Sequence, residues 1–250
     1  FVGAQSSAPE PMVTLTPEEQ AWLAEHPEIL LGAATGYEPM VIKRSDGTHV
    51  GVLVDLFEQI SRALNSSIRL HIENSWAVIQ EKAQKREIDG LSFGGRDPSR
   101  DALYNATDIV MPTYFSVFAR SQDEYRIERF SDLQSMRIGY KKGARPTRSL
   151  LKKLPAAILK PYENHESMTQ ALLKKEVDVI VAWMSYDHWR KKTLQGTIDK
   201  IYMIEEYPIE MFIYIRKDWP ELVPILNKAI VVALQQDELP RIINKWFGEW

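Results

Sequence analysis

Short apolar runs that alternate with amphipathic stretches constrain the fold of this chain more than any other feature. The runs at residues 29–31 and 177–182 have the length of buried strands. Between such runs, apolar side chains recur at helical spacing, as they do at Val54, Phe57 and Ile60. Strands that alternate with helices form mostly parallel sheets joined by right-handed crossovers. The pattern therefore predicts an α/β fold.

The same patterns place the individual elements. Thr16, Pro17 and Glu19 have the spacing of a capping box with proline in the first turn, which predicts a helix over 17–25. Further helices are expected at 54–64, 76–83, 147–153, 168–175, 221–234 and 239–247. Strands are expected at 29–31, 68–72, 88–91, 136–140, 157–159, 177–182 and 210–215.

A chain of 250 residues is long for one hydrophobic core and suits two small ones. No Gly/Ser-rich tether separates two halves, so we expect two α/β lobes joined by extended strands. The polar segments 121–125 and 205–208 bracket the second lobe and are the predicted break points.

Composition excludes several classes of protein. A hydrophobic fraction of 44% and a charged fraction of 26% are ordinary for a folded globular chain. The net charge of −3 provides no basic footprint for nucleic acid, which is not an expected partner. With no cysteine, the chain has neither disulfides nor thiol nucleophiles. No apolar run approaches the ~18 residues that a membrane span needs.

The first residues are not predicted to belong to the folded part of the chain. Gly3 and Ala4 are small residues of the kind found at a secretory cleavage site, but residues left by cloning explain them equally well. Pro9 and Pro11 then form a stiff spacer. Residues 1–13 are therefore expected to be a leader remnant and spacer.

Searches for catalytic motifs return nothing. The chain has no nucleophile elbow, no P-loop and no dinucleotide fingerprint. Its 5 histidines are scattered, without the spacing of a metal site. Asp187 and His188 are adjacent only in sequence, and we expect an exposed helix face there. The sequence predicts a protein that is not an enzyme and that has no metal and no cofactor.

Two segments have the composition of a small-molecule site. Residues 89–100 run from a strand end through glycines to a helix start, with Asp97 as the cap, Pro98 behind it and Arg100 as a planar fork for a carboxylate. Residues 139–147 repeat the order of strand, glycine loop and helix. Exposed main-chain N–H groups at such corners can bind anions. Either segment alone is explained better by ordinary surface turns.

Taken together and in order, these segments resemble the family 3 periplasmic solute-binding proteins. Residues 37–40 lie where the family has Tyr-x-Pro-Phe, and 51–56 match its Gly-x-x-x-Asp-Leu helix opening. Residues 97–100 lie on its Thr-Pro-Glu-Arg, upstream of 106–108, which match Phe-Thr-Asp. The resemblance runs from about Thr14 to the end. It also covers Trp76, residues 88–90, 132–133, 138–139, Gly143 and 177–178.

The resemblance implies the two-lobed, type 2 periplasmic-binding (Venus-flytrap) fold, with two strands crossing between the lobes. Lobe 1 would comprise 14–120 and 209–250, and lobe 2 would comprise 121–208. A solute would bind in the cleft and close the lobes about the crossing strands. The residues that the resemblance assigns to ligand binding are Tyr37, Trp76, Phe93, Asp97, Arg100, Gly143, Thr147 and Trp183. Of these, Arg100 would hold a carboxylate, and the N–H groups near Gly143 to Thr147 would hold anionic oxygens. Tyr37, Trp76 and Phe93 would supply apolar walls.

Two departures from the family pattern bear on the ligand. Asp97 replaces a threonine beside the clamp, where it would bind no carboxylate and could instead pair with Arg100. Trp183 replaces an aspartate that neutralises the ammonium of an amino acid. Trp183 is consistent either with stacking on an aromatic or cationic solute or with a core position below the cleft. The ligand is therefore expected to be an amino-acid-like solute or an organic acid, not necessarily a standard α-amino acid.

Three functions share this fold. The leader around Leu15–Pro27 resembles that of family 3 modules fused to histidine kinases or diguanylate cyclases, which favours a membrane-tethered periplasmic sensor domain. The partners would then be membrane-embedded signalling domains of the same protein. The second hypothesis is a free binding protein that delivers solute to an ABC permease. The third and remotest is a dehydratase-like enzyme, with Glu38, Asp97 or Asp187 as the acid.

Overall fold

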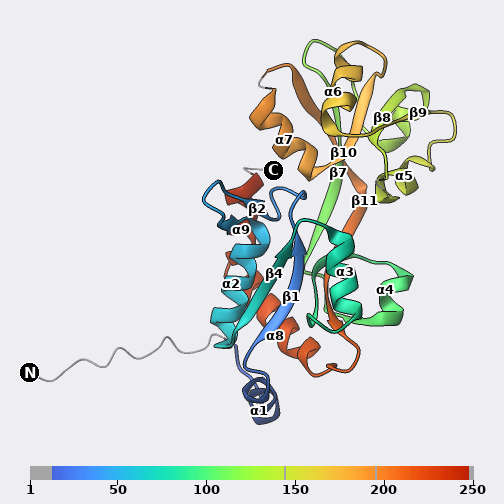
Figure 1. Cartoon of the computed structure of the whole chain (residues 1–250). Helices are drawn as coiled ribbons and strands as arrows, with labels where there is room; N and C mark the ends of the chain where they lie inside the picture. The colour runs from blue at the N-terminus through green and yellow to red at the C-terminus, as the bar shows by residue number, and fades with distance from the viewer. Residues whose placement is uncertain (1–12, 144, 195, 248–250) are drawn as a thin grey trace, which may run out of the picture. The chain divides into compact units, whose positions relative to one another are not determined.

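The computed structural model describes residues 13–143, 145–194 and 196–247, and the chain forms two compact units (Figure 1). Unit 1 comprises the chain up to Met111 and from Met211 onward, and unit 2 comprises Pro112–Glu210. The chain enters unit 2 along strand β7 (Met111–Arg120) and returns along the 19-residue strand β11 (Ile198–Arg216). The leader predicted at 1–13 lies, except for the buried Val13, outside the described residues.

The sheet of unit 1 has the order β4-β1-β5-β11. Strands β1 (Ile29–Ala34), β4 (Ile68–Glu73) and β5 (Gly90–Gly95) are parallel, and β11 runs antiparallel to β5. The short strand β6 (Tyr104–Ala106) pairs with β11. A separate two-stranded ladder joins β2 (Ile42–Lys43) to β3 (His49–Val50). Five of the six β1 residues are buried, as expected for a central parallel strand covered on both faces.

Six helices of unit 1 surround this sheet. They are α1 (Pro17–Glu25), α2 (Val52–Leu64), α3 (Trp76–Gln84), α4 (Pro98–Leu103), α8 (Leu222–Gln235) and α9 (Glu238–Phe247). Helices α2, α8 and α9 pack on one another, and α3 packs on β1, β4 and β5. The predicted capping box is confirmed: the Thr16 hydroxyl accepts from the Glu19 N–H, and the Glu19 carboxylate accepts from the Thr16 N–H.

Unit 2 is built on strands β8 (Arg137–Lys141), β9 (Ile158–Tyr162) and β10 (Val179–Trp183), with β10 antiparallel to β7. Its helices are η1 (Phe130–Ser135), α5 (Arg145–Leu151), α6 (His165–Leu173) and α7 (Met184–Thr193). Successive residues of β10 enter different core clusters. Val179 and Val181 belong to one cluster, and Ile180 and Ala182 belong to the other. The sheet is therefore covered on both faces.

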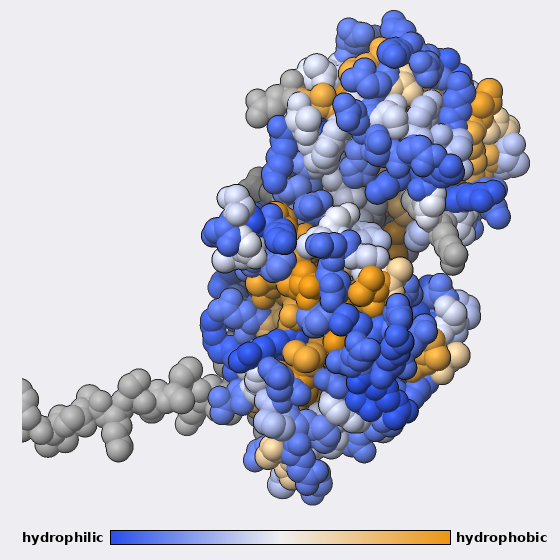
Figure 2. All heavy atoms as spheres, in the orientation of Figure 1, coloured by the Kyte–Doolittle hydropathy of each residue, from blue (hydrophilic) through white to orange (hydrophobic). Residues whose placement is uncertain are grey.

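The predicted α/β class and the order of the predicted helices and strands are confirmed. The short elements β2, β3, β6 and η1 were not predicted, and of the expected strands that join the units, β7 and the stretch of β11 before residue 210 were not placed. In β11, charged residues such as Lys200 and Glu205 interrupt the apolar pattern, so no strand signal remains there. On the face that Figure 2 shows, hydrophilic residues cover most of unit 2, and hydrophobic residues reach the surface in places on both units.

The described ranges contain neither a membrane-spanning helix nor a cluster of metal ligands. No helix among these residues is both long and apolar enough to cross a membrane. Within the same ranges, carboxylates and imidazoles do not gather in groups of three or more that could hold a metal ion.

Candidate functional site

The corner between β5 and α4 positions the predicted carboxylate clamp. Asp97 is the N-cap of α4, and its Oδ1 accepts from the Ser99 N–H at 2.8 Å and from the Ser99 hydroxyl at 2.6 Å. Pro98 occupies the first turn, where its missing N–H is not needed. The cap predicted from the sequence is confirmed. It places Arg100 in the first turn of α4, close to the end of β5.

Arg100 lies close to two aromatic rings. Its guanidinium carbon is 5.8 Å from the ring centroid of Trp76 and 5.7 Å from that of Tyr214. Both distances are within the range of cation–π attraction. Its Nη1 donates to the Gly95 carbonyl at 2.7 Å. The half-buried guanidinium is thus near two aromatic rings and tied to the main chain at one nitrogen. We call Trp76, Gly95, Arg100 and Tyr214 the Arg100 cluster.

Two further features of this cluster fix the position of Arg100. The Tyr214 hydroxyl donates to the same Gly95 carbonyl at 3.0 Å, and burial raises the pKa of Tyr214, which keeps that hydroxyl protonated. Next to Gly95, a Cβ added at Gly94 would stand 2.7 Å from Arg100 Nη1. The guanidinium therefore approaches the main chain so closely that only glycine leaves it room.

Of the residues predicted to form apolar walls, Tyr37 is exposed and Phe93 is buried. The Tyr37 ring is 44% exposed and meets Trp76 edge-on, with 6.4 Å between the ring centroids. Trp76 is the first residue of α3 and connects Tyr37 to the Arg100 cluster. Phe93, in contrast, lies inside β5 and is only 7% exposed. Tyr37, Trp76 and Arg100 are thus brought together, whereas Phe93 is a core residue with little surface to offer.

Two of the predicted residues of unit 2 lie at the β8–α5 corner. Gly143 follows β8 with φ of +77°, a left-handed conformation that favours glycine. Thr147 lies in α5 and is 4% exposed, so its hydroxyl faces the interior of unit 2. Thr147 could therefore contact a solute only through its main chain, and residue 144 of the predicted segment lies outside the described residues.

Trp183 ends β10 and begins α7. Its indole N–H donates to Thr113 Oγ1 at 3.1 Å, and the Thr113 hydroxyl donates to the Ile209 carbonyl at 3.3 Å. The ring is partly buried and packs against the core cluster of unit 2 that contains Val181. The indole is therefore fixed by its own unit, whether or not its remaining surface meets a solute.

The sequence predicted an exposed helix face at Asp187 and His188, and the structure corrects this prediction. These residues do lie on a helix, α7, but the Asp187 side chain is only 14% exposed. Its carboxylate forms ion pairs with Arg190 at 2.7 Å, Lys191 at 3.4 Å and Lys200 at 3.8 Å. Arg190 and Lys191 pair with Asp187 at helical spacing, which the sequence could have shown, whereas Lys200 comes from β11 and has no local signal. Of the three candidate acids, Asp97 caps a helix, Asp187 is ion-paired and Glu38 is half-buried.

The sequence did not reveal three groups that complete these sites: Tyr214, the Gly95 carbonyl and Thr113. Tyr214 lies in an apolar strand, where a tyrosine is indistinguishable from any other core aromatic residue. Its pairing with Arg100 spans more than a hundred residues and arises only when β11 pairs with β5. A carbonyl has no sequence signature at all.

Comparisons with known proteins support the fold. A family model for bacterial extracellular solute-binding proteins, family 3, matches residues 29–249. The virulence sensor protein BvgS of Bordetella bronchiseptica is 21% identical over 238 residues. The aligned part is 92% of this chain and 18% of that protein, so the chain spans under a fifth of the length of this relative.

Solved structures resemble the chain over nearly its whole length. The periplasmic VFT2 domain of Bordetella pertussis BvgS superposes with a TM-score of 0.76 at 17% identity, covering 94% of this chain and 99% of that one. Substrate-binding domain 2 of Lactococcus lactis GlnP superposes with a TM-score of 0.72 at 16% identity, covering 96% and 99%. At these identities the likeness concerns the fold. It confirms the type 2 periplasmic-binding fold that the sequence predicted.

Proposed function

Because the chain belongs to the bacterial extracellular solute-binding proteins of family 3, we propose that it is the solute-binding sensor module of a larger membrane signalling receptor. Its ligand in this proposal is a small solute that carries a carboxylate and is amino-acid-like or an organic acid. The module acts outside the cytoplasm, tethered to the membrane by the rest of the receptor. No nucleic acid, metal or cofactor takes part.

The observation that carries the binding proposal is the Arg100 cluster. A guanidinium has five N–H donors in a rigid fork, and Nη1 uses one of them on Gly95. Donors remain for a bidentate contact with a carboxylate, which is the geometry that arginine recognises best. The rings of Trp76 and Tyr214 hold the fork in place before a ligand arrives. Binding therefore requires little further ordering of this side chain.

Unit 2 supplies a second set of groups in this proposal. The N–H groups of 143–147 are assigned to anionic oxygens, and the remaining face of Trp183 is assigned to the body of the solute. A tryptophan at that position favours an aromatic or cationic body over a bare α-ammonium group. Binding of an ordinary α-amino acid with high affinity would contradict this part of the proposal.

The sensor role is supported by the likeness to the sensor protein BvgS. The region of BvgS that aligns with this chain is 18% of the length of BvgS. A specific observation favours the alternative of a binding protein for an ABC importer, because a substrate-binding domain of a putative amino acid ABC transporter from Streptococcus pneumoniae has the same fold. The coding sequence downstream of residue 250 discriminates between them. An apolar segment of ~20 residues followed by a cytoplasmic signalling domain supports the receptor. A stop codon beside a permease gene supports the importer.

The binding proposal is tested by thermal unfolding of the chain with a panel of amino acids, aromatic acids and polyamines. We expect at least one carboxylate solute to raise the melting temperature, because a ligand that binds only the native state stabilises it. Arg100→Ala should abolish that rise. Arg62→Ala is the matched control, since Arg62 is exposed on α2 and pairs only with its helix neighbours. A rise that persists in Arg100→Ala would assign Arg100 a structural role.

A further inference from the structure

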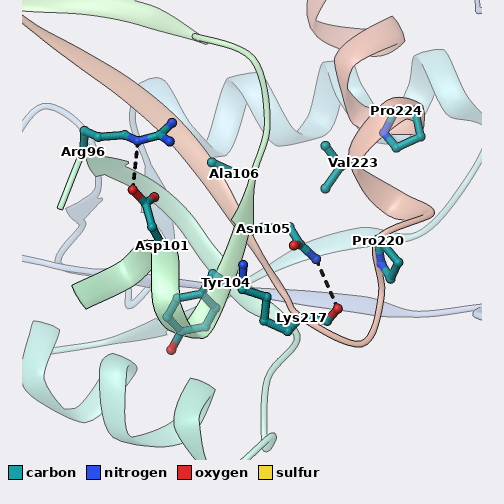
Figure 3. A pocket seen from close by; sticks show the side chains of 9 residues that line it. All are labelled: Arg96, Asp101, Tyr104, Asn105, Ala106, Lys217, Pro220, Val223 and Pro224. Carbon is teal, nitrogen blue, oxygen red and sulfur yellow. Dashed lines mark hydrogen bonds and ion pairs between the residues drawn. The ribbon is translucent and has the colours of Figure 1, made fainter. Parts of the chain in front are cut away.

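A depression on the surface of unit 1 takes no part in the proposed function. Its volume is about 420 Å³, within the range of small-molecule sites. Three segments line it: the β5–α4 corner, strand β6 and the turn from β11 into α8 (Figure 3). We call it the β6 pocket. None of its lining residues belongs to the Arg100 cluster.

The pocket has a cationic lining. Lys217 is exposed and forms no ion pair with any residue in the described ranges. Its side chain turns back across the pocket toward β6 (Figure 3). Arg96 stands on the side of α4, with its Nε 3.1 Å from Asp101 Oδ2. That pair is 60% and 38% exposed, so it is weak and can admit a second anion. Two cations and one carboxylate leave a net charge of +1.

The opposite wall is apolar. Pro220, Val223 and Pro224 come from the start of α8, and Ala106 of β6 lies between them and Arg96 in the view of Figure 3. The Tyr104 hydroxyl points away from this wall and is buried, so Tyr104 contributes only part of its ring. A cationic side facing an apolar wall matches a ligand with one negative group and a compact apolar body.

The main chain at the start of α8 does not supply the anion contacts. The N–H of Leu222 donates to the Trp219 carbonyl at 3.2 Å, and that of Val223 donates to the Pro220 carbonyl at 3.3 Å. Pro224 has no N–H. Asn105 is also fixed, because its Nδ2 donates to the carbonyls of Arg216 and Lys217. Recognition of an anion therefore depends on the side chains of Lys217 and Arg96.

We propose that the β6 pocket is a second ligand site, for small monocarboxylic acids with a compact apolar body. Lys217 and Arg96 hold the carboxylate, and Pro220, Val223 and Pro224 contact the body. This assignment is independent of the solute bound at the Arg100 cluster, because the pocket shares no residue with it.

The test is methyl NMR of the full chain titrated with benzoate. We expect saturable shifts of the Val223 and Ala106 methyl signals, with a dissociation constant of about 1 mM, as for a fragment-sized ligand. Benzamide, which has the same shape without the charge, should shift them far less. Lys217→Met should weaken benzoate binding by about five- to tenfold. Lys43→Met, which removes an exposed lysine of β2, is the matched control and should change nothing.

Three results would overturn the proposal. The first is the absence of saturation at Val223 and Ala106 with benzoate up to about 10 mM. The second is equal binding of benzamide, or of benzoate to Lys217→Met, which would leave only a non-specific apolar contact. The third is loss of the Val223 shift in Arg100→Ala, which would show that the signal originates at the Arg100 cluster. Survival of the shift in that variant separates the two sites, whatever the outcome for the proposed function.

Discussion

Tyr214 is the residue whose removal tests the Arg100 cluster most sharply. Its hydroxyl donates to the Gly95 carbonyl oxygen at 3.0 Å, and that carbonyl oxygen also accepts from Arg100 Nη1 at 2.7 Å. Tyr214→Phe removes the hydroxyl and keeps the ring below the guanidinium. The carbonyl retains Arg100 as a partner, so no buried group is left unpaired. The expected loss of unfolding free energy is that of one neutral hydrogen bond, about 1 kcal/mol.

A second buried tyrosine in the same unit provides the control. Tyr104 lies 6.3 Å from Tyr214 between ring centroids, and its hydroxyl is buried with no hydrogen-bond partner among the described residues. Burial raises the pKa of Tyr104, as expected for a phenol out of contact with water. Tyr104→Phe should therefore be neutral or stabilising, because it removes an unsatisfied polar group.

The two variants are compared by urea unfolding and by NMR of the Arg100 Nε–H signal. Tyr214→Phe should lower stability by about 1 kcal/mol and move the Arg100 signal, whereas Tyr104→Phe should not lower stability. For a solute found by the thermal panel, Tyr214→Phe should weaken binding by about fivefold. Equal stability effects of the two variants, together with an unmoved Arg100 signal, would refute the reasoning that Tyr214 positions Arg100 through Gly95.

Three further predictions concern single positions. Asp97→Ala should cost about 1 kcal/mol of unfolding free energy, because it removes the N-cap of α4, and Asp97→Ser should restore most of it in the same urea titration. Gly94→Ala should displace Arg100, since the new Cβ would stand 2.7 Å from Nη1; a crystal structure with Arg100 unmoved would contradict this. Burial, with a smaller contribution from Lys141, lowers the pKa of His165 to about 4 from 6.5, so the unfolded chain binds the proton first as the pH falls. Stability should thus drop by about 1–2 kcal/mol between pH 6.5 and pH 4, allowing for partial exposure, and His165→Gln should flatten that slope in unfolding curves measured across this range.

The sequence predicted the local elements well because their signals are local. The capping box at Thr16, the cap at Asp97 and the apolar run at 177–182 each depend on residues close together in the chain. The long strand β11 was found only in part, because its polar residues before position 210 hide the strand pattern. Whether such a segment forms a strand is decided by its pairing with neighbouring strands and not by its intrinsic propensity.

For the candidate site, the sequence by itself determined which residue types are present: a glycine-rich corner, an N-cap and an arginine behind it. Only the tertiary structure decided what surrounds them. Tyr214 reaches Arg100 because β11 lies antiparallel to β5, and Lys200 of β11 reaches Asp187 of α7. Contacts between residues far apart in the chain depend on which strands become neighbours in the sheet, and the local patterns of the sequence do not specify that order.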